Sequence, residues 1–172
     1  MKWTKSKLIR ASSFATHPGF DPSTLFNDVG VVILSKPVRG VTPGVLPSEN
    51  LLDQMKAAGT LQGQTFVSVG YGATAAFKGM PPALAFDGVR RFSTSPYGGL
   101  TQNWLHLLGN HDATGEGSTC FGDSGGPHFL GDSNLIVSVT SWGDAIYRSL
   151  DMTQRADTAS VRAFLGDFVT LP

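Results

Sequence analysis

The stretch Gly117-Ser-Thr-Cys-Phe-Gly-Asp-Ser-Gly-Gly-Pro127 is the one segment whose residues are hard to explain by folding alone. It holds four glycines and a proline, which the interior of a strand does not favour. Glycines beside Ser124 allow backbone conformations closed to other residues and let a second molecule approach closely. The backbone N–H groups of Gly122 and Ser124 could then converge on one point and stabilise an oxyanion. Ser124 is therefore a candidate nucleophile.

This segment resembles the nucleophile region of the chymotrypsin/trypsin-like serine peptidases, the S1 family, in which a cysteine stands four residues before the serine of G-D-S-G-G-P. Here Cys120 precedes Ser124 at that spacing. The stretch Phe26-Asn-Asp-Val-Gly-Val-Val-Ile-Leu34 resembles the family's segment that holds the triad aspartate. Two shorter matches, Val69-Gly-Tyr-Gly72 and Ser141-Trp-Gly143, follow in the family's order. The resemblance covers residues 15–168, and the scarcity of cysteine makes the chain more similar to bacterial members.

The resemblance implies a role for one or more residues in each motif. Ser124 would be the nucleophile, and Asp28 would be the buried carboxylate that orients an imidazole. The backbone N–H groups of Gly122 and Ser124 would form the oxyanion hole. Asp123 would take no part in catalysis but would pair with the α-amino terminus that forms when a zymogen is cut. The residues implied for the substrate pocket are Ser118, Ser141, Trp142 and Gly143.

No histidine of the chain fits the family's general base, which lies roughly 45 residues before the aspartate. Only 27 residues precede Asp28. The histidine among them, His17, lies in a His-Pro-Gly-Phe sequence that resembles the family's surface loop before the aspartate strand, and we expect it to be a structural or solvent histidine. His106 and His111 fall in a polar stretch expected to be a loop, and His128 lies on a strand leading away from the serine. We therefore expect an N-terminally truncated peptidase domain that is nearly inactive by itself.

The rest of the sequence predicts mostly β structure. Three stretches have the composition of strands: Val29–Leu34, Thr65–Tyr71 and Leu135–Trp142. The first of them is almost wholly apolar, as in a strand buried on both faces. Helices are expected at Ser48–Gly59 and, after a cap at Asp157 or Thr158, in the apolar-periodic stretch that reaches Phe168. The turn-rich stretches are Lys78–Pro82 and Ser95–Gly99.

Together with the resemblance, this pattern implies an all-β fold. It would be the chymotrypsin-like double antiparallel β-barrel, followed by a C-terminal amphipathic helix. We expect residues 1–172 to form a single partial domain with one whole barrel and part of the other, in which residues 1–14 are a poorly defined arm. The open edge of the incomplete barrel would make the chain prone to aggregation.

Composition restricts the remaining classes of function. Thirteen basic and thirteen acidic residues cancel, which leaves no electrostatic footprint for nucleic acid or an anionic membrane. The single cysteine, Cys120, excludes an internal disulfide and a multi-cysteine zinc site, and we expect it to be a free thiol that serves as a small buried hydrophobe. We expect a polypeptide substrate, no cofactor, no metal, no membrane partner and a monomer when complete. The resemblance implies secretion, although the chain shows no signal peptide.

Substrate choice in the family depends on the residue six places before the nucleophile, which here is Ser118. A neutral hydroxyl leaves a buried cation without a counter-charge, so we expect basic side chains to be poor substrates. Gly143 would open the pocket to aromatic or large aliphatic side chains, a chymotrypsin-like preference. Asp144 is the doubtful element, because its carboxylate could point into this pocket.

Three alternatives stay open. The sequence Gly122–Gly126 also satisfies the G-x-S-x-G motif of α/β-hydrolases, but only His128 among the histidines follows the serine and Gly-Gly-Pro opposes the helix that this motif starts. The chain also has an aspartate, a histidine and a serine in the order found in subtilisin-like peptidases, but the residues around them lack that family's signatures. The main alternative is a non-catalytic serine-peptidase homologue that acts as a protein-binding module.

Overall fold

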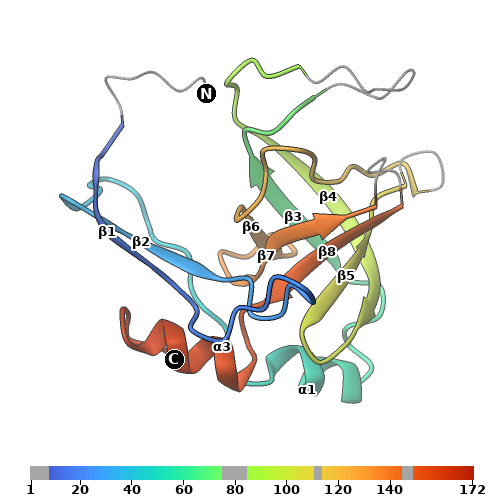
Figure 1. The fold of residues 1–172 in the computed structure, drawn as a ribbon. Helices are drawn as coiled ribbons and strands as arrows, with labels where there is room; N and C mark the ends of the chain where they lie inside the picture. Colours follow the sequence, from blue (N-terminus) through green and yellow to red (C-terminus); the bar gives the residue numbers. More distant parts are fainter. Residues whose placement is uncertain (1–7, 75–84, 111–113, 145–148) are drawn as a thin grey trace.

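The computed structural model of the protein describes residues 8–74, 85–110, 114–144 and 149–172. The described chain forms a closed barrel and, beside it, a pair of strands (Figure 1). The barrel strands are β3 (Thr65–Gly70), β4 (Arg91–Leu100), β5 (Trp104–Leu108), β6 (Pro127–Leu130), β7 (Ile136–Gly143) and β8 (Leu150–Arg155). The strand pair is β1 (Ala11–Thr16) and β2 (Gly30–Leu34), and the helices are α1 (Leu51–Ala57) and α3 (Ala159–Gly166).

The barrel closes because β3 pairs on both of its sides. Its strand order is β3-β4-β5-β8-β7-β6, and every neighbouring pair is antiparallel. Phe66 of β3 lies opposite Ser95 of β4 on one side and Leu130 of β6 on the other. A closed ring leaves no strand unpaired along its whole length, so free edges occur only where a strand extends beyond its neighbour. The expected whole antiparallel barrel is therefore confirmed.

Apolar side chains from the strands and from helix α1 fill the barrel core. Leu52 of α1 and Phe66 of β3 are both fully buried, and burying such a side chain contributes about 1.5–3 kcal/mol. Helix α1 therefore packs against the barrel and covers part of its core. The buried residues of this core are Leu52, Leu61, Phe66, Leu100, Leu105, Leu107 and Val137.

Both predicted helices form, with small shifts at their ends. Thr158 is the N-cap of α3, as expected, and its hydroxyl accepts a hydrogen bond from the N–H of Val161. The α3 helix ends at Gly166, two residues before Phe168. Helix α1 starts after Asn50 rather than at Ser48, and Asn50 has a left-handed backbone (φ 57°) that ends the preceding loop. The helical periodicity thus located both elements but not their exact starts and ends.

A buried ion pair fastens both helices to the barrel. Arg155, which is 1% exposed at the end of β8, donates to both carboxylate oxygens of Asp157 at 2.8 and 2.9 Å. Asp157 also accepts the N–H of Leu52 at 2.8 Å, and Arg155 reaches Asp53 of α1 at 2.5 Å. A buried charge is tolerated when it is paired and hydrogen-bonded in this way.

The β1–β2 pair is exposed, which corrects one expectation. The strand predicted at Val29–Leu34 forms as β2, but it is not buried on both faces: Val32 is 61% exposed. The reason is that only β1 pairs with β2 among the described residues. Strand β1 itself begins at Ala11, inside the stretch expected to be a poorly defined arm, and its Phe14 is 79% exposed.

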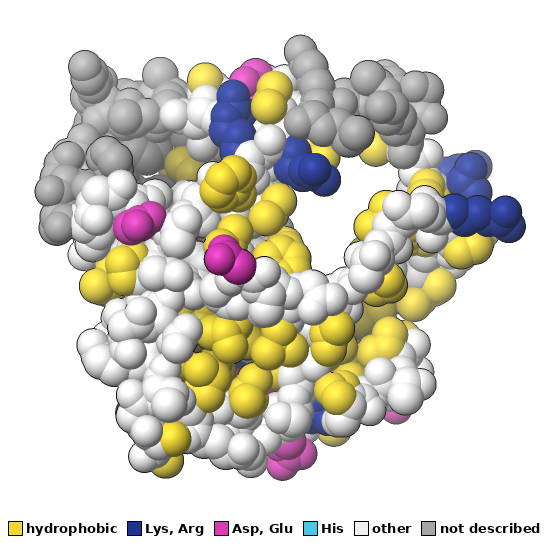
Figure 2. Space-filling view, turned by 180° about the vertical axis from the view of Figure 1, so that it is seen from behind, with side chains coloured by type: hydrophobic (Ala, Val, Ile, Leu, Met, Phe, Trp, Pro, Cys, Tyr) yellow, Lys and Arg dark blue, Asp and Glu magenta, His cyan; other side chains and the backbone are white. Residues whose placement is uncertain are grey.

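An open hollow separates the β1–β2 pair from the barrel. Figure 2 shows hydrophobic side chains on its walls and basic side chains at its rim. Large exposed apolar surfaces of this kind mark places where another polypeptide or ligand binds. The exposed apolar residues of the strand pair are Phe14, Val32, Ile33 and Leu34.

Two further expectations about the barrel were wrong, and one strand was not predicted. Ser95–Gly99 is not a turn but lies within β4, where a bulge between Tyr97 and Gly99 accommodates the glycines. His106 lies on β5 rather than in a loop. Strand β8 was missed because polar residues, all buried, fill most of it. The predicted turn at Lys78–Pro82 and His111 lie outside the described residues.

Candidate active site

Ser124 stands exposed in a tight loop just before β6. Gly122 and Gly125 have φ values of 94° and 76°, which favour glycine. The loop is fastened to β7 because the N–H of Gly125 donates to the carbonyl of Thr140, and the N–H of Thr140 donates to the carbonyl of Gly126, both at 2.9 Å. These glycines therefore serve the loop geometry that presents the serine.

Two N–H groups of this loop have no acceptor among the described residues. The N–H groups of Asp123, Gly125 and Gly126 all donate to backbone carbonyls, but those of Gly122 and Ser124 do not. An N–H group of a serine and another two residues before it can stabilise negative charge on an oxygen that approaches from solvent. These two donors are the ones that the sequence predicts for an oxyanion hole.

Asp28 lies close to β7, although this strand is remote from it in the sequence. Its Oδ2 accepts a hydrogen bond of 2.6 Å from the Ser141 hydroxyl, and its backbone N–H donates to Gln154 Oε1 at 3.3 Å. The preceding residue, Asn27, has a left-handed backbone with φ 57°, and its amide donates to the carbonyl of Gly19. Because Thr140 holds the Ser124 loop and Ser141 holds Asp28, both motifs meet at one stretch of β7.

The three described histidines form no hydrogen bond with Asp28 or Ser124. His17 is buried against Phe164; its Nδ1 accepts the N–H of Gly19 and its Nε2 lies 3.2 Å from Ser160. This structural role for His17 agrees with the prediction. His128 is fully buried in the barrel, on β6 as expected, with Nε2 2.9 Å from the Thr140 hydroxyl.

Burial also lowers the pKa of both barrel histidines. For His128 the pKa falls to about 3, and for His106 burial lowers it as well. A buried imidazole loses the hydration of its charged form, so the neutral form is favoured. Neither side chain is placed to take a proton from Ser124.

Asp123 links the Ser124 loop to the Val69–Gly72 motif. Its two carboxylate oxygens accept the N–H groups of Gly72 and Cys120, at 2.7 and 2.9 Å. A methyl group added at Gly70 would lie 1.8 Å from Asp123 Oδ1, and one added at Gly72 would lie 2.4 Å from Oδ2. The glycines of the predicted Gly-Tyr-Gly motif therefore make room for this carboxylate. A cavity of about 340 Å³ adjoins it.

The end of β7 offers a free edge beside these groups. Strand β6 pairs with β7 only as far as Pro127 opposite Val139, whereas β8 continues to Gly143. The backbone of residues 141–143 therefore has no described neighbour on the β6 side, and an extended peptide can add there as a strand. Trp142 is 41% exposed and contacts Trp104 edge-on, with ring centroids 6.1 Å apart.

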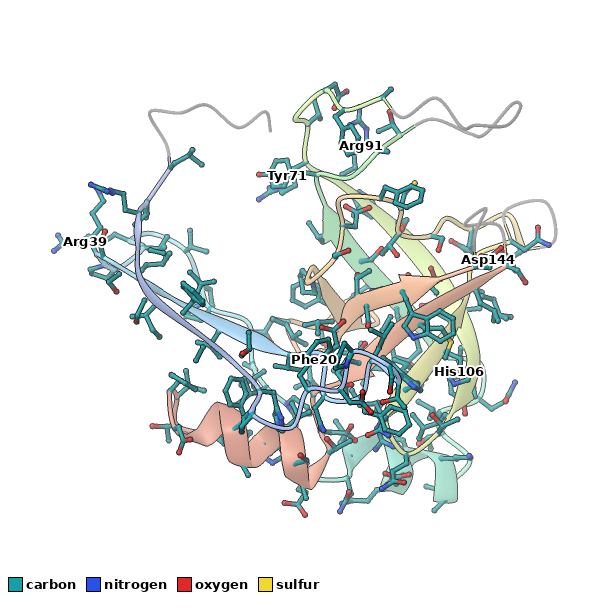
Figure 3. All side chains as sticks on the ribbon, viewed as in Figure 1. Phe20, Arg39, Tyr71, Arg91, His106 and Asp144 are labelled. Carbon is teal, nitrogen blue, oxygen red and sulfur yellow. The ribbon has the colours of Figure 1, made fainter. Side chains whose placement is uncertain are left out.

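Ser118 and Asp144 are the other two residues considered for the pocket. Ser118 is half-buried beside Gly109, where an added methyl would lie 2.6 Å from its hydroxyl. Asp144, at the end of β7 in Figure 3, accepts the N–H groups of Ser149 and Leu150 at 3.2 and 3.3 Å. Its carboxylate is thereby turned toward its own loop.

Cys120 is a free thiol, as expected, and it is partly rather than fully buried. Burial raises its pKa, and the nearby charge of Asp123 contributes. A thiol with a raised pKa is mostly protonated at neutral pH and is a poor nucleophile. Ser124, rather than Cys120, is thus the exposed candidate nucleophile of this segment.

Four residues that the sequence did not single out complete the site: Thr119, Thr140, Asp151 and Gln154. Thr140 contacts the loop through its backbone, and Gln154 reaches Asp28 from a strand that was not predicted. The only signal for Thr140 was its place directly before Ser141. Nothing local in the sequence pointed to Asp151 or Gln154, because their roles depend on the barrel register.

The described residues support neither a metal site nor a membrane-spanning helix. In the parts of the chain that the structure describes, no three His, Cys, Asp or Glu side chains gather as metal ligands do. None of the described helices has the length and apolar character that a membrane span requires.

Curated relatives of the chain are trypsins. It is 29% identical to Trypsin beta of Drosophila erecta over 78% of this chain and 52% of that protein. It is 25% identical to Trypsin alpha-4 of Lucilia cuprina (92% and 60%) and 26% identical to Trypsin alpha-3 of the same species (92% and 93%). The chain thus spans little more than half of the first two and nearly all of the third. These relatives are insect proteins, so the expected closeness to bacterial members finds no support.

Solved structures and a family model agree with the fold. A structure of heparin binding protein has a TM-score of 0.71 at 21% identity, covering 95% of this chain and 68% of that one. A structure of HL collagenase has a TM-score of 0.64 at 18% identity, covering 92% and 68%. The model of the Trypsin family matches residues 2–158. The chain therefore belongs to the trypsin family, the chymotrypsin/trypsin-like serine peptidases.

Proposed function

We propose that the complete protein is a serine endopeptidase in which Ser124 is the nucleophile and Asp28 orients the general base. The observation that carries this proposal is the meeting of the two motifs on β7. Ser141 donates to Asp28 at 2.6 Å, while the neighbouring Thr140 accepts the N–H of Gly125 beside the serine. A fold alone does not require a serine and a carboxylate to converge at one exposed strand edge.

In the proposed reaction a peptide adds along residues 141–143 as a strand. The Ser124 hydroxyl loses its proton to the base and attacks the carbonyl carbon, and the N–H groups of Gly122 and Ser124 stabilise the oxyanion. The base then protonates the leaving amine, and water hydrolyses the acyl-enzyme by the same steps in reverse. Asp28 stabilises the imidazolium form of the base.

We infer that the base comes from polypeptide outside this chain. Two observations support this: the three described histidines form no hydrogen bond with Asp28 or Ser124, and an apolar hollow lies beside β2, the strand that begins two residues after Asp28. Loss of the base costs roughly 10⁶-fold in kcat in an analogous serine peptidase. The chain by itself is therefore expected to be nearly inactive.

The proposal is tested by measuring peptide hydrolysis with an extended protein, in which this chain is preceded by the polypeptide encoded upstream of it in the same gene. The extended protein should turn over a peptide substrate, and this chain should show only residual activity. Ser124→Ala should abolish turnover, and Asp28→Asn should lower kcat by roughly 10⁴-fold because the base adopts the wrong tautomer. Full activity in an extended Ser124→Ala protein would refute the assignment of the nucleophile.

A non-catalytic homologue that binds proteins is the second candidate. The observation in its favour is that Asp28 has no histidine partner among the described residues. This second candidate function predicts that the extended protein binds peptides at the β7 edge but never turns them over.

We also propose an extracellular location and a monomeric complete protein that acts on polypeptides and not on nucleic acid. The family resemblance and the balanced charge of the chain support these.

A further inference from the structure

Asp28 lies outside the barrel, so the pairing of barrel strands does not fix its position. It stands in the loop between β1 and β2, two residues before β2 begins, and these two strands pair only with each other among the described residues. The Ser124 loop, in contrast, is hydrogen-bonded to β7 of the barrel. The distance between the carboxylate and the serine therefore depends on the contacts that Asp28 makes with the barrel.

The backbone around Asp28 has an uncommon conformation that its surroundings must hold. Leu25 and Asn27 have left-handed backbones, with φ values of 59° and 57°, which are uncommon for residues other than glycine. The N–H of Val29 donates to the carbonyl of Asn27 at 2.8 Å, so Asp28 is the central residue of a three-residue turn. That turn does not use the N–H of Asp28, which therefore needs an acceptor from another element.

Gln154 of β8 provides this acceptor. Its Oε1 accepts the N–H of Asp28 at 3.3 Å, and its Nε2 donates to the backbone carbonyls of Asn103 and Arg155 at 3.2 and 3.3 Å. The Gln154 side chain is fully buried. Its place requires an acceptor at one atom and a donor at the next, which an amide offers and which neither an aliphatic side chain nor a carboxylate offers. The donor side of the amide holds its acceptor side in place for Asp28.

Gln154 and Ser141 hold Asp28 at two separate points. Gln154 binds the backbone N–H of Asp28, whereas the Ser141 hydroxyl donates to its carboxylate at 2.6 Å. The two contacts come from neighbouring strands, because β7 and β8 pair with each other. Strand β7 also holds the Ser124 loop through the backbone of Thr140. The nucleophile and both contacts of the carboxylate are thus attached to one pair of hydrogen-bonded strands.

We propose that Gln154 is a positioning residue, which fixes the Asp28 carboxylate relative to Ser124 by binding the backbone N–H of Asp28. The consequence for catalysis rests on the proposed function. A single hydrogen bond at the carboxylate leaves the residue free to turn about that bond, and the second bond at the backbone prevents this rotation. Without Gln154 the carboxylate orients the general base less well and turnover slows. The loss is limited to the roughly 10⁴-fold expected when Asp28 itself is replaced by Asn.

Peptide hydrolysis by the extended protein tests this role, with Gln154→Met as the variant, because methionine has a similar length but no amide. We expect kcat to fall at least tenfold and KM to change by less than threefold, since Gln154 does not lie on the β7 edge where the peptide adds. The acid limb of the kcat profile should move to lower pH, because a displaced carboxylate stabilises the charged form of the base less.

Thr153→Val is the matched control for Gln154→Met. It also removes a buried hydrogen bond from β8, the one between the Thr153 hydroxyl and the carbonyl of Leu105, but it does not touch Asp28. We expect its kcat to stay within twofold of the unaltered protein and its pH profile to stay in place. Unchanged kcat in Gln154→Met, or an equal loss in both variants, would overturn the proposal.

Hydrogen exchange at the Asp28 amide of this chain tests the contact itself, and it remains informative if Gln154→Met does not fold. In the unaltered chain the Asp28 N–H should exchange at least tenfold more slowly than in an unstructured peptide, because it is half-buried and bonded to Gln154. A folded Gln154→Met should lose this protection, and Thr153→Val should keep it. Exchange at the unstructured rate in the unaltered chain would overturn the proposal. Since this measurement needs no turnover, an extended protein that hydrolyses no peptide would contradict the proposed function and not the contact.

Discussion

Single residues of this chain are often explained by a partner far away in the sequence. Gly70 and Gly72 are the clearest case, because a side chain at either position would occupy the space of the Asp123 carboxylate. In the sequence these glycines were part of a match to the family, and the structure adds the physical reason for them. Ser141 is a second case, because its hydroxyl donates a hydrogen bond to the carboxylate of Asp28.

Replacing Gly72 tests the fit around Asp123. In Gly72→Ala the new methyl would lie 2.4 to 2.6 Å from the carboxylate atoms of Asp123, whose Oδ1 accepts the N–H of Gly72. We expect a loss of about 1–3 kcal/mol in the free energy of unfolding, typical of overpacking. Gly99→Ala is the matched control, since its nearest contact would be an ordinary 3.8 Å. Urea unfolding that finds equal stability in both variants would contradict this packing.

Stability against acid should depend on His128 and Asp151 in opposite directions. Burial lowers the pKa of His128 from 6.5 to about 3, so the unfolded chain takes up a proton that the folded chain excludes, and stability falls as the pH drops below about 6.5. Burial raises the pKa of Asp151 from 3.8 to about 6, which favours the folded chain as the pH drops below about 6. The larger shift belongs to His128.

Thermal unfolding between pH 7 and 4.5 measures this balance. We expect Tm to fall with the pH in the unaltered chain, to fall less in His128→Gln, and to fall more steeply in Asp151→Asn. The comparison among the three proteins cancels the contribution of exposed carboxylates. Identical slopes would mean that neither group has the shifted pKa.

At the level of elements, the periodicity of the sequence located the helices and three strands because their apolar residues repeat regularly. It failed for β8, whose Asp151, Thr153, Gln154 and Arg155 are polar and buried. Such residues are tolerated inside because each has a partner from another element, as Arg155 has in Asp53 and Thr153 has in the carbonyl of Leu105. A partner that is remote in sequence gives no local pattern, so this strand could not be predicted.

The buried pair of Arg155 and Asp157 should be the strongest polar link between the helices and the barrel. Asp157→Asn leaves the Arg155 guanidinium buried without its main counter-charge, and we expect a loss of about 3–5 kcal/mol. Asp53→Asn should cost about 1 kcal/mol or less, because the Asp53 side chain is 55% exposed and solvent screens its charge. Denaturant unfolding of the two variants should rank them in this order. The reverse ranking would contradict it.

At the level of the whole molecule, the closed barrel is self-sufficient but the β1–β2 pair is not. The sequence correctly predicted one whole barrel and part of another, because the motifs fall in the family's order. It did not predict that β2 is exposed, since an apolar strand gives no indication of whether its neighbours are present. The site was also predicted only in part. Asp28 and Ser141 were identified from sequence motifs, whereas the positions of Gln154 and Asp151 depend on how the strands pair in the fold.

The exposed strand pair predicts binding of apolar dyes to the folded chain. Phe14 and Val32 are 79% and 61% exposed, and we expect 8-anilinonaphthalene-1-sulfonate fluorescence to rise on mixing with native protein. Phe14→Thr combined with Val32→Thr should reduce this signal at least twofold without lowering the stability of the barrel. Phe92→Thr, on the barrel and 74% exposed, is the matched control. A signal that depends only on Phe92 would place the apolar binding surface elsewhere.

The most direct test of the central claim is covalent labelling by a fluorophosphonate probe, with the modified residue identified by mass spectrometry. The account predicts a single adduct on Ser124 in the polypeptide extended upstream, none in its Ser124→Ala variant, and almost none in this chain alone. Absence of any adduct in the extended protein, or an adduct on a residue other than Ser124, would contradict it.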